Sequence, residues 1–126
     1  MSIKDEIRDY IKSGYTIRDI AIITGYSESW IRIEILRQAI DTYGADKQML
    51  KTIEECGELT RAISRILTEL SSGEGFTNKE SENNLYEEIA DVEIMLQQLK
   101  MIFKCEDKVN EQIEFKIKRL KERLEQ

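Results

Sequence analysis

The chain contains no proline among its 126 residues, and apolar side chains recur at helical spacing along most of its length. Proline interrupts helices more strongly than any other residue, whereas the abundant Glu, Lys, Leu, Ile and Arg favour them, so the chain is predicted to be all-α. Long helices are expected at about 46–70, 82–104 and 107–124, with a loop rich in Gly and Ser at 71–78. A chain of this length can bury a core of its own.

The first 40 residues differ from the rest because their six basic and six acidic side chains balance, so residues 41–126 carry the whole net charge of −6. We therefore expect two domains, 1–40 and 41–126. Short helices are predicted within the first at about 4–12, 17–24 and 28–40.

Residues 16–31 resemble a helix-turn-helix unit. Ala21 is the small residue that lets two helices cross closely, and Gly25 supplies the turn between them. The positions that pack apolar side chains in such a unit hold Ile20, Tyr26 and Ile31.

This resemblance makes DNA a candidate partner through residues 16–39, with Ser27, Ser29 and Arg32 as candidate contacts. A DNA-binding surface usually carries a net positive charge, whereas this segment is neutral and the sequence pI is about 4.9. The alternative is a small helical cap used for packing, oligomerisation or protein contacts.

Several classes of chemistry are excluded by what the sequence lacks. Histidine is absent, which removes zinc sites built on imidazole and Ser-His nucleophilic machinery. No apolar stretch approaches membrane-spanning length and the first residues have no signal-peptide pattern, so we expect a cytoplasmic protein without a membrane partner. The two cysteines, Cys56 and Cys105, are expected to be buried, reduced thiols.

Two acidic clusters, 54–58 and 87–91, lie within segments that otherwise resemble amphipathic helices. Glu55 and Glu58 are three residues apart, as are Glu88 and Asp91, so each pair projects from one side of its helix. If the two helices pack together, the four carboxylates converge and repel one another unless a cation or shared protons intervene. An oxygen-only cluster suits Mg²⁺ or Mn²⁺. The pattern alone leaves a metal site and a solvated or salt-bridged face as equal alternatives.

The same residues resemble the MazG-like all-α nucleoside triphosphate pyrophosphatases over about residues 43–124. Residues 51–59, Lys-Thr-Ile-Glu-Glu-Cys-Gly-Glu-Leu, match the family's Glu-Glu-x-x-Glu helix, and 87–92 match its Glu-x-x-Asp helix. Gln48 precedes the first motif as in the family, and residues 116–124 resemble its basic closing helix. The resemblance implies a bundle of long helices completed by a homodimer or homotetramer.

The family's site residues are carried over position by position. Four match its metal ligands, for Mg²⁺ or alternatively Mn²⁺: Glu55, Glu58, Glu88 and Asp91. Glu54 matches the leading glutamate, which orients or deprotonates the attacking water or pairs with a cation. Candidate substrate-binding residues are Gln48, Lys51, Lys116 and Arg119.

The implied reaction is metal-assisted hydrolysis of a nucleoside triphosphate between the α- and β-phosphates, giving a monophosphate and pyrophosphate. Two other functions stay open. One is a DNA-binding regulator whose helical C-terminal part dimerises or senses a nucleotide, and the other is a non-catalytic interaction protein on this scaffold.

Overall fold

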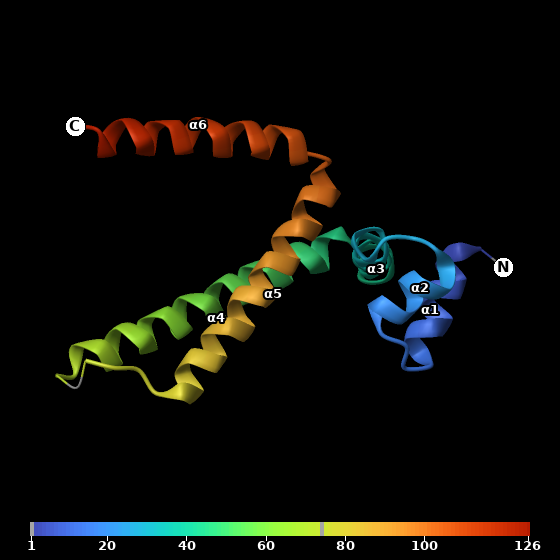
Figure 1. The fold of residues 1–126 in the computed structure, drawn as a ribbon, viewed down its shortest axis with the longest axis horizontal. Helices are drawn as coiled ribbons and strands as arrows, with labels where there is room; N and C mark the ends of the chain where they lie inside the picture. Colours follow the sequence, from blue (N-terminus) through green and yellow to red (C-terminus); the bar gives the residue numbers. More distant parts are fainter. Residues whose placement is uncertain (1, 74) are drawn as a thin grey trace. The chain divides into compact units, whose positions relative to one another are not determined.

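The computed structural model describes residues 2–73 and 75–126, and over these residues the chain forms six helices and no strand (Figure 1). The predicted all-α class is confirmed. The helices are α1 (Ile3–Lys12), α2 (Ile17–Thr24), α3 (Glu28–Tyr43), α4 (Ala45–Ser71), α5 (Lys79–Phe103) and α6 (Glu106–Leu124). Within the described ranges no helix is both long enough and apolar enough to cross a membrane.

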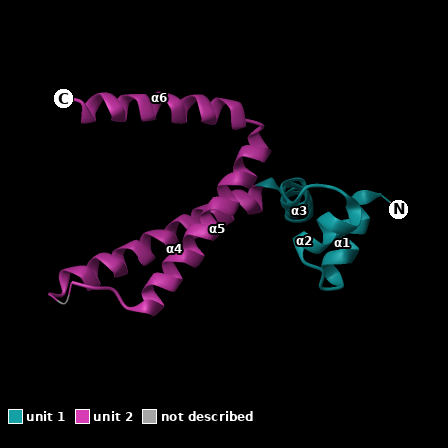
Figure 2. Ribbon diagram, in the orientation of Figure 1, with its two compact units in different colours: residues 1–45 teal, residues 46–126 magenta. Residues whose placement is uncertain are grey.

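The chain divides into two compact units, residues 1–45 and 46–126 (Figure 2). The division lies a few residues after the boundary at 40/41 expected from the sequence. The reason is that α3 continues to Tyr43 and ends only at Gly44, whose φ of 90° belongs to a region that side chains rarely adopt.

The first unit is built around Ile7, Ile20 and Ile31, one from each of its three helices and all fully buried. The hydroxyl of Thr16 caps α2, and Gly25 ends it with a φ of 80°. Burial of Ile20 and Ile31 agrees with the sequence prediction. The predicted burial of Tyr26 is wrong, because its side chain is 42% exposed. Its ring stacks on that of Trp30, with ring centroids 4.2 Å apart.

In the second unit α4 and α5 run antiparallel, and two polar contacts hold their register. Near the start of α4, Gln48 Nε2 donates to Gln98 Oε1 at 2.7 Å, and both side chains are buried. Near its end, Glu69 accepts from the hydroxyl of Ser81, in the first turn of α5. The acidic clusters lie between these two contacts.

The face of α4 that is buried in the single chain is mainly polar, with Gln48, Thr52, Glu55 and Ala62. Its apolar stripe is left exposed, as shown by Ile53 at 69% and Leu67 at 59%. α6 buries no residue. Both cysteines are free, but Cys56 is exposed and Cys105 is only partly buried, so the expectation of two buried thiols was wrong. Cys56 belongs to the exposed stripe.

Candidate metal centre

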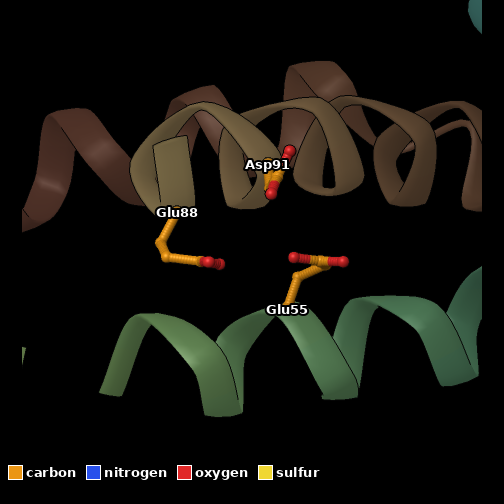
Figure 3. A group of neighbouring side chains, drawn as sticks. All are labelled: Glu55, Glu88 and Asp91. Atoms are coloured by element: carbon orange, nitrogen blue, oxygen red, sulfur yellow. The ribbon is translucent and has the colours of Figure 1, made fainter. Parts of the chain in front are cut away.

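Three of the four predicted metal ligands converge between α4 and α5. One carboxylate oxygen each from Glu55, Glu88 and Asp91 lies within 4.8 Å of the other two (Figure 3). Oxygens that coordinate Mg²⁺ at about 2.1 Å lie at most about 4.2 Å apart, so modest side-chain rotation would bring all three to one ion. Figure 3 shows Glu55 rising from α4 towards the two acidic side chains of α5.

Two oxygens of this cluster lack the partners that buried charge requires. Glu55 is only 6% exposed, and its Oε2 and that of Glu88 have no hydrogen-bond partner among the described residues. A buried carboxylate oxygen without a partner is costly. A divalent cation would satisfy both oxygens together, so this donor set fits a hard metal ion.

The electrostatics of Glu88 reflect the same crowding. Burial raises the pKa of the Glu88 carboxyl above its ordinary value, and the negative charges of Glu58, Asp91 and Glu55 raise it further. Without a cation, Glu88 therefore holds its proton more tightly than an isolated glutamate.

Glu58, the fourth predicted ligand, lies at the edge of the cluster. It is outside the group that lies within 4.8 Å, but it lines one cavity together with Glu88. Glu54, the predicted catalytic residue, is exposed on α4 beside Glu55 and does not belong to the converging group.

The predicted substrate-binding residues of α4 have partners within the chain. Lys51 Nζ lies 3.3 Å from Glu55 Oε1, and this contact raises the pKa of the Lys51 ammonium. The amide of Gln48 donates to Gln98, so its position is explained by helix packing. Lys116 and Arg119 are exposed on α6.

The candidate DNA contacts lie on or beside α3. Ser29 and Arg32 are exposed, and Ser27 caps the helix by accepting from the backbone N–H of Trp30 at 3.0 Å. Glu34, an acidic residue of α3, is 1% exposed and pairs with Arg37 at 2.7 Å, so it adds little negative charge to the surface.

Sequence reasoning missed the residues that flank the cluster. The cavity that contains Glu58 and Glu88, about 380 Å³ in volume, is also lined by Arg61, Arg65 and Asn84. Arg61 and Arg65 follow Glu58 at helical spacing, which was the available signal. Gln98 was missed because its partner Gln48 lies 50 residues earlier in the chain.

No known protein family, curated protein or solved structure matches this chain. Membership of the MazG-like superfamily therefore stays a prediction that depends on the two acidic motifs and the basic tail.

Proposed function

We propose that the chain is a Mg²⁺-dependent nucleoside triphosphate pyrophosphohydrolase. The observation that carries the proposal is the pair of unpartnered Oε2 atoms of Glu55 and Glu88, in a group of carboxylates gathered within 4.8 Å. Acidic side chains on a solvated face need no counter-ion, whereas the buried Glu55 and the half-buried Glu88, gathered with the exposed Asp91, favour one. Mg²⁺ and a polyphosphate are a natural pair, since Mg²⁺ is usually held by a few carboxylates together with substrate phosphates.

In this proposal Mg²⁺, when bound, would supply positive charge that offsets the charge of the phosphates. Glu55, Glu88 and Asp91 hold it, and Glu58 completes the acidic wall on the cavity side. Glu54 accepts a proton from water as the water oxygen bonds to the α-phosphorus. The bond from that phosphorus to the α–β bridging oxygen breaks, and pyrophosphate leaves with the electron pair.

The test is pyrophosphate release from a panel of ribo- and deoxynucleoside triphosphates with Mg²⁺, Mn²⁺ or EDTA. Turnover is expected with either metal, none with EDTA, and none in Glu88→Gln. Glu87→Gln is the matched control, because it removes the same charge from the neighbouring exposed position of α5. Absence of turnover for every nucleotide, or equal turnover in Glu88→Gln, would overturn the proposal.

The proposed active form is a homodimer or homotetramer. Support comes from the apolar stripes that the single chain leaves exposed on α4 and on α6, for example Ile53 at 69% and Ile117 at 60%. Exposed apolar stripes on long helices are typical of helices that pack against another subunit.

Duplex DNA binding by the first unit is a second candidate function, favoured by the exposure of Ser29 and Arg32 on α3 next to the turn at Gly25. It predicts salt-dependent binding of duplex DNA that Arg32→Ala weakens. Failure to bind at low salt would leave the alternative of a protein contact, in which the exposed Ile22 and Tyr26 take part.

A further inference from the structure

The cavity of about 380 Å³ between α4 and α5 is lined by side chains of both charges. Glu58 and Glu88 belong to the acidic side, and Arg61 and Arg65 supply two positive charges from the next turns of α4. Asn84, half-buried on α5, adds an amide. A metal-bound anion fits this combination, because the carboxylates face the cation and the guanidinium groups face the anion.

Both guanidinium groups keep most of their hydrogen-bonding capacity. Arg61 lies 3.9 Å from Glu58 and Arg65 lies 3.7 Å from Glu69, and both distances exceed a normal hydrogen bond. Glu69 already accepts from the hydroxyl of Ser81 and from the backbone N–H of Asn78. The planar N–H groups of arginine match phosphate oxygens well, so both side chains are available for a phosphate.

We propose that this cavity binds the β- and γ-phosphates of the substrate, the part that leaves as pyrophosphate, through Arg61 and Arg65. The inference rests on the proposed function and adds to it the direction of the substrate along α4. The α-phosphate lies at the acidic cluster, the pyrophosphate portion lies towards the C-terminal half of α4, and the nucleoside lies on the side of Lys51.

The chemistry of cleavage favours this direction. Negative charge accumulates on the pyrophosphate oxygen as its bond to the α-phosphorus breaks, and fixed positive charge nearby stabilises that state. On the other side of the cluster the ammonium of Lys51 already lies 3.3 Å from Glu55. The arginine side therefore offers two loosely held cations, against one that is already paired.

The proposal is tested by calorimetric binding of inorganic pyrophosphate in the presence of Mn²⁺, together with Mn²⁺ binding alone. Arg61→Gln and Arg65→Gln are each expected to weaken pyrophosphate binding about threefold, and together about tenfold, because the side chains are 77% and 47% exposed and solvent screens their charge. Mn²⁺ binding alone is expected to stay within twofold. Lys79→Gln, an exposed cation of α5 outside the cavity, is the matched control.

The outcomes separate this inference from the proposed function. Wild-type turnover with unchanged pyrophosphate affinity and unchanged KM in the double arginine variant would overturn the subsite and leave the function standing. An equal loss in Lys79→Gln would also overturn the subsite, because it would reveal a general charge effect. Failure of the wild-type protein to bind Mn²⁺ would overturn both.

Discussion

Gln48 and Gln98 join α4 to α5 through a buried hydrogen bond, with Gln48 Nε2 lying 2.7 Å from Gln98 Oε1. Together with the contact between Glu69 and Ser81 at the other end, this bond holds the antiparallel register. The register brings Glu55 opposite the acidic side chains of α5. A polar contact that specifies helix alignment therefore determines where the carboxylates meet.

Replacing Gln98 by leucine is expected to lower the free energy of unfolding by about 1–3 kcal/mol, because the buried amide of Gln48 loses its partner. Gln48→Leu should cost a similar amount. The double variant should cost less than the sum of the two, since neither amide is then left unpaired. Urea unfolding in EDTA at one protein concentration measures the free energy of unfolding of all three variants. If the two single losses add up to the loss in the double variant, the two glutamines do not stabilise the protein through their mutual hydrogen bond.

Metal is expected to stabilise the protein through the converging carboxylates. At about one hundred times the dissociation constant, Mn²⁺ should add about 2.7 kcal/mol to the free energy of unfolding and raise Tm by several degrees. Glu88→Gln and Asp91→Asn should lose this shift, and Glu87→Gln should keep it. Calorimetric melting with Mn²⁺ and with EDTA gives both values.

The same experiment has a second readout. Glu88→Gln is expected to melt at a higher temperature than the wild type in EDTA, because it relieves repulsion among Glu55, Glu58 and Asp91. A variant that lost the metal effect and was also less stable without metal would indicate a damaged fold rather than a missing ligand.

The sequence predicted the helices well, because their signals are local. Thr16 and Ser27 cap α2 and α3, and glycines end both helices. The stripe of α4 that includes Ile53 was also visible from its spacing. What the spacing could not reveal is that this stripe lies exposed while Gln48 and Glu55 face α5. Which face of α4 packs against α5 depends on tertiary contacts such as the hydrogen bond between Gln48 and Gln98.

The acidic cluster was predicted for a similar local reason, since the three-residue spacing places each pair on one side of its helix. The sequence could not predict which of the four carboxylates would lie within the cluster. Glu58 lies outside the group within 4.8 Å, although its charge acts on Glu88, because the register of α4 against α5 decides which carboxylates converge on one point. The cavity with Arg61 and Arg65 also forms only when both helices are in place.

Stability without metal is expected to depend on pH through Glu88. Its pKa in the folded state is raised above the ordinary value of 4.5, so the folded state binds more protons than the unfolded state over that interval. The free energy of unfolding therefore falls as pH rises from below 4.5 through the folded pKa. The charges that act on Glu88 are those of Glu58, Asp91 and Glu55, and Arg61 and Arg65 line the same cavity as Glu88.

Urea midpoints measured in EDTA between about pH 4 and 8 test this dependence. The difference between wild type and Glu88→Gln isolates the one carboxyl, and Glu87→Gln should follow the wild type. Excess Mn²⁺ should remove the decline, because metal binding displaces the Glu88 proton. Parallel curves for wild type and Glu88→Gln would show that the Glu88 carboxyl is not perturbed.

Self-association is expected to involve α6, whose apolar stripe is exposed in the single chain at Ile113, Ile117, Leu120 and Leu124. Each Ile or Leu that becomes buried contributes about 1.5–3 kcal/mol, so the double variant Ile117→Gln/Leu120→Gln should weaken association by about a hundredfold or more. Because α6 buries no residue, these changes leave the core of the single chain intact.

Sedimentation over a range of protein concentrations measures the strength of this self-association. Lys118→Gln/Lys121→Gln changes two exposed residues of α6 outside this stripe and should associate like the wild type. A wild-type protein that is monomeric at every concentration would contradict self-association through this stripe.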